Sequence, residues 1–214
     1  MYRPTHHGYI EVITGPMYAG KTELLIHRIK REVIAGRRTM VFKPDIDDRY
    51  SEKAVVTHNG EALYATIIPV NHPEFIFTYV DAVEQEEKTK VHAIGIDEAQ
   101  FFTLELTEVV RKLANRGIRV VISGVDVDYR DMPWRPMSDL MAMAEFVEKL
   151  TAVCECGQPA TKIQRYRNDK LSHWDEPTII VGSNIEGQEF QYSAKCRGCW
   201  HMPLKTITGG KDNE

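Results

Sequence analysis

The feature that most constrains this chain is the octapeptide GPMYAGKT, which runs from Gly15 to Thr22. It matches the pattern G-x-x-x-x-G-K-[ST], in which the glycines let the backbone wrap closely around phosphate oxygens. The N–H groups at the start of a following helix favour the anion, Lys21 adds a positive charge for the β- and γ-phosphates, and the Thr22 hydroxyl can ligate Mg²⁺. The alternative is an ordinary glycine-rich turn. The phosphate-binding interpretation requires a strand before the loop and a helix after it.

The flanking segments supply that context. Tyr9–Thr14 is a β-branched and aromatic run that predicts a strand, and apolar residues at helical spacing from Lys21 onward predict a helix that ends near Gly36. Strands and helices then alternate: we expect strands at Arg38–Lys43 (closed by Pro44), Val91–Asp97 and Arg119–Ser123, and helices at Pro73–Lys88 and Leu104–Asn115. This alternation predicts an α/β fold of the P-loop NTPase type, a mainly parallel sheet with helices on both faces.

Length and charge limit the partners. With 214 residues, 43% of them hydrophobic, the chain can bury a self-sufficient core. A formal net charge of −4 provides no general basic field for a nucleic-acid polymer. No uncharged run approaches the roughly 18 residues of a membrane span, and the first residues do not have the pattern of a secretory signal. We therefore expect a cytoplasmic protein that acts on neither nucleic-acid polymers nor membranes.

Two consecutive acids, Asp97 and Glu98, follow a predicted strand in the segment IGIDEAQFF. The carboxyl ends of strands are where α/β sheets bind ligands, and the alternation of a strand directs consecutive side chains to different sides. One acid can therefore face the Mg²⁺ of the phosphate-binding loop, while the other faces an acceptor hydroxyl as general base. Two solvated acids that merely end a strand are the alternative.

The four cysteines form two pairs, Cys154 with Cys156 and Cys196 with Cys199. Thiolates paired on two turns suit a tetrahedral structural Zn²⁺, although a cysteine-rich turn or a redox pair has the same composition. The alternation of predicted strands and helices ends near Leu150. We therefore expect an α/β nucleotide-binding domain over residues 1–150 and a small zinc-binding lobe over residues 151–214. Such a small lobe needs the metal, because it is too short to bury a large core.

A further arginine follows the second predicted strand in the segment DIDDRY, Asp45–Tyr50. Arg49 would stabilise developing negative charge if it lay beside a transferred phosphate. A polar surface loop is the alternative.

Four motifs occur here in one order: GPMYAGKT, DIDDRYS, DEAQFF, and Y-x-x-x-C-R-x-C from Tyr192 to Cys199. Together they resemble the type II thymidine kinase family of zinc-containing deoxynucleoside kinases, over about residues 10–200. The resemblance implies transfer of the γ-phosphoryl group of ATP to the 5′-hydroxyl of thymidine, and of deoxyuridine as well, in deoxynucleotide salvage. It also implies a homo-tetramer or homo-dimer.

The resemblance assigns roles to individual residues. Glu98 matches the base, the four cysteines match the zinc site, and Mg²⁺ would be held by Thr22, Asp97 and Asp47. The residues expected at ATP are Gly15, Pro16, Met17, Tyr18, Ala19, Gly20, Lys21, Thr22, Arg49, Asp97 and Gln100. Those expected at the nucleoside are Met17, Phe101, Tyr129, Trp134, Ile163, Gly182 and Tyr192.

The chain departs from the family pattern at several positions. Its first cysteine pair is C-x-C rather than C-x-x-C, and Ile163 stands where many relatives have threonine. The polar stretch 167–176 is expected to form a loop that covers the nucleoside. The extra residues 184–191 are expected to form a hairpin with Gly187 in its turn.

Two functions from other classes remain as alternatives at this point. A P-loop NTPase switch shares the phosphate-binding motif, but the guanine-reading N-K-x-D motif is absent. A zinc-ribbon nucleic-acid binder shares the cysteine pairs, and the negative net charge disfavours it.

Overall fold

A computed structural model describes residues 7–46, 54–56, 62–180, 184–185 and 188–205 of the chain. Its largest element is a six-stranded sheet with the strand order β5-β2-β6-β7-β1-β8, in which every neighbouring pair is parallel. The strands are β1 (Tyr9–Thr14), β2 (Arg38–Asp45), β5 (Thr66–Pro69), β6 (Val91–Ile96), β7 (Arg119–Gly124) and β8 (Phe146–Lys149). All carboxyl ends therefore lie at one edge of the sheet.

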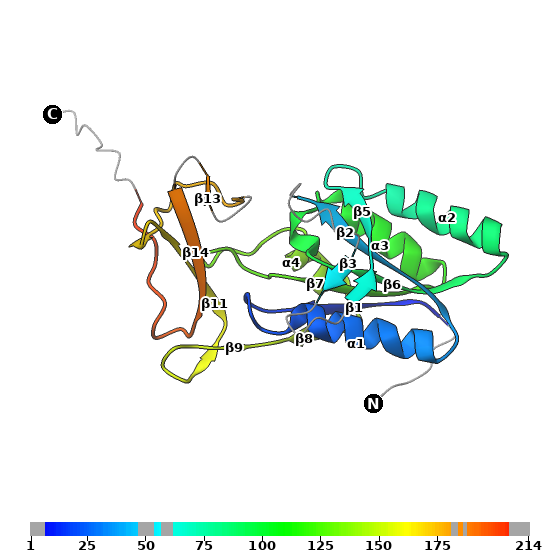
Figure 1. Cartoon of the computed structure of the whole chain (residues 1–214), viewed down its shortest axis with the longest axis horizontal. Helices are drawn as coiled ribbons and strands as arrows, with labels where there is room; N and C mark the ends of the chain where they lie inside the picture. Colours follow the sequence, from blue (N-terminus) through cyan, green and yellow to red (C-terminus); the bar gives the residue numbers. More distant parts are fainter. Residues whose placement is uncertain (1–6, 47–53, 57–61, 181–183, 186–187, 206–214) are drawn as a thin grey trace.

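Helices cover both faces of this sheet, as the sequence predicts (Figure 1). Ile10 and Val12 of β1 pack in one apolar cluster with residues of α2 (Phe75–Glu87), α3 (Glu105–Asn115) and α4 (Met137–Met143). Ile13 packs on the other face in a second cluster, with residues of α1 (Lys21–Ile34). Burial on both faces explains why the central strands β1, β6 and β7 are mostly apolar in sequence.

The predicted strands and helices are confirmed with small shifts at their ends, apart from one correction. Pro44 was expected to close the second strand, but it lies inside β2 and is paired with Ile68 of β5. The neighbouring strand β6 ends at Ile96, and its last bond to β2 runs from Asp97 N to Phe42 O (2.9 Å). Because no strand continues beside Pro44 on that side, its missing N–H leaves no partner unsatisfied.

Several short elements before Leu150 were not expected from the sequence. Among them are β5, α4, β8 and a hairpin of β3 (Ala54–Val56) with β4 (Ala62–Tyr64). Each is short, with three to seven residues, so its apolar periodicity is too brief to be recognised in a sequence.

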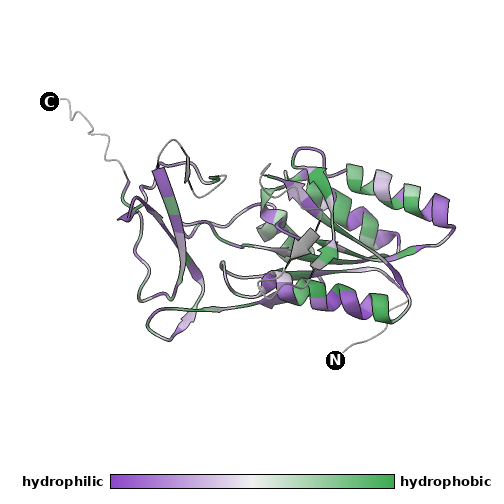
Figure 2. Ribbon diagram, in the orientation of Figure 1, coloured by the Kyte–Doolittle hydropathy of each residue, from purple (hydrophilic) through white to green (hydrophobic). Residues whose placement is uncertain are grey.

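The residues after β8 form antiparallel sheets that extend from one end of the parallel sheet (Figure 1). β9 (Ala152–Val153) pairs with β10 (Pro159–Ala160), and β11 (Lys162–Arg167) pairs with β12 (Lys170–Leu171) and β14 (Gln188–Lys195). We call residues 151–205 the C-terminal lobe. Hydrophobic residues are concentrated in the parallel sheet, whereas β14 is largely hydrophilic (Figure 2).

Two expectations fall in this lobe. The hairpin over residues 184–191 is confirmed where the chain is described, because β13 (Asn184–Ile185) pairs with the start of β14; Gly187 lies outside the described residues. The stretch 167–176 is not irregular throughout, since it begins in β11, returns as β12 and buries Ser172. Within the described part of the chain, no helix is long and apolar enough to span a bilayer.

Candidate functional site

The loop between β1 and α1 has backbone conformations that favour glycine. Gly15 has φ of 140° and Gly20 has φ of 82°. A Cβ atom on Gly15 would lie 2.4 Å from the carbonyl oxygen of Leu150, so no larger residue fits there without a shift of the backbone. The loop ends where α1 begins at Lys21, which directs the first N–H groups of the helix towards any anion held in the loop.

The Lys21 ammonium group is folded back onto this loop and donates a hydrogen bond to the carbonyl of Pro16 (2.8 Å). Burial lowers the pKa of Lys21, and the negative charges of Glu98, Asp97 and Asp126 oppose that effect. The lysine is thus a largely desolvated cation beside a cluster of acids. An anionic phosphate group would replace the water that this side chain has lost.

Asp97 connects three strands of the sheet to the loop. It follows β6, accepts hydrogen bonds from the Thr22 hydroxyl (3.2 Å to Oδ2) and from the Ser123 hydroxyl at the end of β7, and is buried. Burial and the charge of Glu98 raise the pKa of Asp97 to about 6, against the effect of these hydrogen bonds. Oxygen atoms of Thr22 and Asp97 lie together at this edge, and that donor set suits Mg²⁺.

Glu98 is held beside Asp97 by an unusual backbone conformation and by Gln100. Its φ is 51°, and its Oε2 accepts a hydrogen bond of 2.5 Å from the Gln100 amide. The other end of that amide accepts a hydrogen bond from the backbone N–H of Val125 (3.1 Å). A Cβ atom on Gly124 would lie 2.7 Å from Gln100 Oε1, so the glycine leaves room for this contact.

Four of the residues expected at the nucleoside form one cluster. Met17, Tyr129, Ile163 and Tyr192 pack together with Val125, which the sequence analysis did not select. Burial raises the pKa of both Tyr129 and Tyr192, while the nearby Arg165 opposes the shift. The cluster joins the phosphate-binding loop to β11 and β14 of the lobe.

The other expected residues fall elsewhere. Phe101 and Trp134 contact each other edge to face, with ring centroids 5.6 Å apart. Asp47, Arg49 and Gly182 lie outside the described residues.

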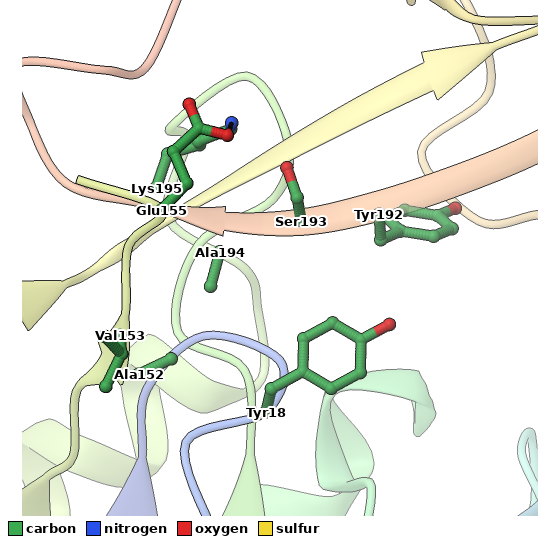
Figure 3. A pocket seen from close by; sticks show the side chains of 8 residues that line it. All are labelled: Tyr18, Ala152, Val153, Glu155, Tyr192, Ser193, Ala194 and Lys195. Atoms are coloured by element: carbon green, nitrogen blue, oxygen red, sulfur yellow. Dashed lines mark ion pairs between the residues drawn. The ribbon is translucent and has the colours of Figure 1, made fainter. Parts of the chain in front are cut away.

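A cavity of about 560 Å³ opens between the phosphate-binding loop and the lobe. Tyr18 borders it from the loop, and the facing wall is formed by residues of β9 and β14 (Figure 3). The lining residues are Tyr18, Ala152, Val153, Glu155, Tyr192, Ser193, Ala194 and Lys195. An ion pair between Lys195 and Glu155 (2.7 Å) lies at one end.

The four cysteines meet in the lobe, and their Sγ atoms all lie within 4.8 Å of one another. The Sγ atoms of Cys156 and Cys196 are 3.7 Å apart, close to the roughly 3.8 Å that tetrahedral Zn–S bonds of about 2.3 Å require. Backbone N–H groups of Cys156 and Cys196 lower the pKa of Cys154 to about 6, which favours a thiolate. The cluster therefore fits a structural zinc site. Ala19 of the phosphate-binding loop packs against a small apolar cluster that contains one of these cysteines, the cluster of Ala152, Cys154 and Ala160.

Sequence reasoning missed Ser123, Val125 and Arg165. Ser123 and Val125 lie at or just beyond the end of a predicted strand, where an α/β sheet binds ligands, and that position was the available signal. Arg165 lies in β11, KIQRYR, where three of the six residues are charged, so no sequence signal distinguished it.

Comparison with known proteins agrees with this geometry. The family model described as "Thymidine kinase" matches residues 8–200. Thymidine kinase of Haloquadratum walsbyi (strain DSM 16790 / HBSQ001) is 40% identical over 221 residues, covering 91% of this chain and 96% of that protein. Among solved structures, domain III of the replication initiation protein DnaA from Thermotoga maritima aligns with a TM-score of 0.38 and 19% identity, covering 66% of this chain and 55% of that chain. That structural likeness is too low to support any conclusion.

Proposed function

The chain belongs to the thymidine kinase family, whose members use ATP to phosphorylate thymidine, and from that premise we propose how its residues carry out the transfer. The observation that carries the proposal is the meeting of Thr22, Asp97 and Glu98 at the carboxyl edge of the sheet, beside Lys21. Phosphoryl transfer needs positioned groups and charge stabilisation rather than covalent chemistry by the protein. These four residues supply both.

The phosphate-binding loop holds the β- and γ-phosphates of ATP. Lys21 moves from the carbonyl of Pro16 to the phosphate oxygens, because a charged acceptor binds an ammonium group more strongly than a carbonyl does. Thr22 and Asp97 would hold Mg²⁺, with Asp47 as a further ligand. Bound Mg²⁺ would neutralise charge on the β- and γ-oxygens. Arg49 stabilises the charge on the transferred group.

Glu98 is the general base that accepts the proton of the 5′-hydroxyl. Asp97, the neighbouring acid, accepts hydrogen bonds from Thr22 and Ser123, whereas Glu98 accepts one from the neutral Gln100 amide. A carboxylate oriented by one amide keeps acceptor positions for a substrate hydroxyl. Gln100 is assigned to the ATP site through its hydrogen bond to Glu98.

The nucleoside lies against Met17, Tyr129, Ile163 and Tyr192, between the phosphate-binding loop and the lobe. Phe101 and Trp134, which lie outside that cluster and contact each other, are assigned as further aromatic contacts of the nucleoside, and Gly182 as a backbone contact. Many relatives have threonine at the position of Ile163, and its hydroxyl could form a hydrogen bond with the base. The aliphatic Ile163 cannot, so the base is held there by packing. We expect deoxyuridine, which lacks one methyl group, to be accepted as a poorer substrate.

The remaining proposals concern the domains, the oligomeric state and the location of the enzyme. Residues 1–150 form the nucleotide-binding domain, and residues 151–214 form the lobe that zinc stabilises. A homo-tetramer or homo-dimer is supported by the half-exposed Phe146 and Val147 on β8, a strand at the edge of the sheet. Free cysteines arranged for a metal are typical of a reducing compartment, which supports a cytoplasmic location.

One assay tests the proposal. Purified protein is incubated with ATP, Mg²⁺ and a panel of nucleosides, and the monophosphate products are measured. Thymidine monophosphate should form fastest, and its formation should require Mg²⁺. Product without Mg²⁺ would contradict the assignment of Thr22 and Asp97. The family assignment removes the nucleotide switch and the nucleic-acid binder as competing functions.

A further inference from the structure

Arg165 is a buried cation that the proposed chemistry does not use. It lies in the middle of β11 and its side chain has no exposed surface. Its guanidinium group lies over the ring of Tyr129, with the central carbon 3.6 Å from the ring centroid. Burying an arginine is costly unless its N–H groups are hydrogen-bonded, so the contacts that it makes define its role.

Those contacts go to one segment, residues 172–178. The Nε atom donates to the Ser172 hydroxyl (3.1 Å), Nη1 donates to the Pro177 carbonyl (2.6 Å), and Nη2 pairs with the Glu176 carboxylate (3.2 Å). Each nitrogen of the fork thus binds a different point of the segment. A lysine has only a single nitrogen and cannot reproduce this arrangement.

The same segment closes over Tyr129. The Tyr129 hydroxyl lies 2.9 Å from the carbonyl oxygens of His173 and Glu176 and 3.1 Å from that of Trp174. Tyr129 is almost fully buried as a result. Arg165, which lies over the face of the Tyr129 ring, therefore binds the segment on one side. The Tyr129 hydroxyl, at the edge of the ring, contacts the same segment.

Alternation along β11 and β14 puts Arg165 on the side of the sheet that faces the proposed nucleoside pocket. Ile163 lies two residues earlier on the same strand, and Tyr192 is the residue of β14 directly opposite Arg165. Residues two apart on a strand, and residues opposite each other across a pair, share one face. Arg165 also lies close enough to Tyr192 to oppose the rise that burial causes in the pKa of the tyrosine. It therefore contacts two of the residues that line the pocket, and adjoins a third.

We propose that Arg165 is a positioning residue for thymidine: it fixes segment 172–178 against Tyr129, so that Tyr129, Ile163 and Tyr192 keep the spacing that accepts the base. This inference rests on the proposed function, which puts the nucleoside in that cluster. Arg165 acts through Tyr129 and the segment and need not touch the reacting atoms. Its loss should weaken nucleoside binding and leave the phosphate-binding loop unaffected.

The test compares the same substitution at two arginines of β11. Arg165→Lys keeps the charge and removes the fork, and Arg167→Lys is the matched control. Arg167 pairs with the same Glu176 carboxylate (3.3 Å) but is 43% exposed. In Arg165→Lys the KM for thymidine should rise by about 10-fold to 100-fold, while kcat and the KM for ATP stay within about threefold. In Arg167→Lys all three constants should stay within about twofold.

A third variant, Ile163→Ala, separates the possible failures. If it leaves the KM for thymidine unchanged, the pocket assignment fails and the proposal falls with it. If Ile163→Ala raises this KM and Arg165→Lys does not, only the role of Arg165 is overturned. Equal losses for thymidine and ATP in Arg165→Lys would show general damage and would also overturn it.

Zinc content and the thermal midpoint establish that each variant is folded. If Arg165→Lys does not fold, Glu176→Gln is tested in its place. That change weakens the contact between Arg165 and the Glu176 carboxylate and keeps the volume of the side chain at position 176. The selective rise in the KM for thymidine is then expected in Glu176→Gln, and its absence would refute the proposal.

Discussion

The parallel sheet and the C-terminal lobe are held together by different interactions. Aliphatic side chains fill both faces of the sheet. In the lobe the apolar clusters are small, and several buried side chains are polar or charged: Lys162, Gln164, Arg165, Ser172 and Lys195. Burial of apolar surface is non-directional, whereas hydrogen bonds and metal ligation depend on geometry.

This difference corresponds to two tasks. The phosphate-binding loop and the acids after β6 are attached to the sheet, whose packing tolerates little movement. The proposed nucleoside pocket is shared with the lobe, whose contacts can be broken one at a time. We therefore expect substitutions in the sheet to affect the chemical step or global stability, and those in the lobe to affect substrate binding.

The largest expected effect is on the chemical step. Glu98→Gln keeps the volume of the side chain and removes its ability to accept a proton, so kcat should fall by roughly 10²-fold to 10⁴-fold. The KM for thymidine and the thermal midpoint should change little. Glu105→Gln, at an exposed position of α3, serves as the control. Near-normal turnover by Glu98→Gln would assign the base elsewhere.

The second effect is on the metal. Cys196→Ser removes one of the four thiolates, so the zinc content should fall from about one per chain to near zero and the lobe should unfold at a lower temperature than the sheet. Elemental analysis and thermal unfolding measure both. Because Ala19 packs against the apolar cluster that contains Cys154, the KM for ATP should also rise. An unchanged KM for ATP would mean that lobe and loop are independent.

The third effect is a pH dependence of stability in the metal-free and nucleotide-free protein. Folding raises the pKa of Asp97 from about 3.8 to about 6, so the folded state binds this proton more tightly than the unfolded state. The contribution is favourable below about pH 4, falls as the pH rises through 6, and changes by about 3 kcal/mol across that window.

Asp97→Asn should abolish this dependence and make the free protein more stable than the parent at pH 7. Denaturant unfolding at several pH values measures it, with Asp81→Asn, at a half-exposed side chain, as the control. Parallel pH profiles for parent and Asp97→Asn would contradict the expectation.

The smallest effect separates backbone conformation from close packing. Both Gly15 and Gly117 have positive φ, but an added Cβ atom meets the Leu150 carbonyl only at Gly15 and has open space at Gly117. Gly117→Ala should cost about 1 kcal/mol of unfolding free energy, and Gly15→Ala should cost more, with loss of ATP binding. Equal costs would indicate that the loop moves away from Leu150 easily.

The sequence predicts the site best where chemistry is local. The loop Gly15–Thr22, the acids Asp97 and Glu98, and the cysteine pairs each carry a recognisable spacing, and the fold supports the first by a strand and a helix. The hydrogen bond from Ser123 to Asp97 depends on β7 lying between β1 and β6. That order is set by packing across the sheet, which no local pattern encodes.

The contacts of Arg165 in the lobe were likewise not predictable from a local sequence pattern. Its strand could be expected from alternation, but the partners that make its burial possible lie in a segment without periodicity. The hairpin of β11 with β12 brings Ser172 back to Arg165, and only a known register reveals this. The hairpin over residues 184–191 was easier to predict from the sequence, because a glycine between polar residues is itself a turn signal.

The position of β1 has a consequence for the assembly of the protein. β1 precedes both of its neighbours in the sheet, β7 and β8, by more than 100 residues of chain. Contacts between such distant residues form slowly, because the intervening chain must be closed into a loop. The proposed ATP-binding loop therefore has no finished scaffold until residues up to Leu150 have left the ribosome. A nascent chain that stops earlier exposes β1 with both edges open, which makes it a substrate for chaperones and prone to aggregation.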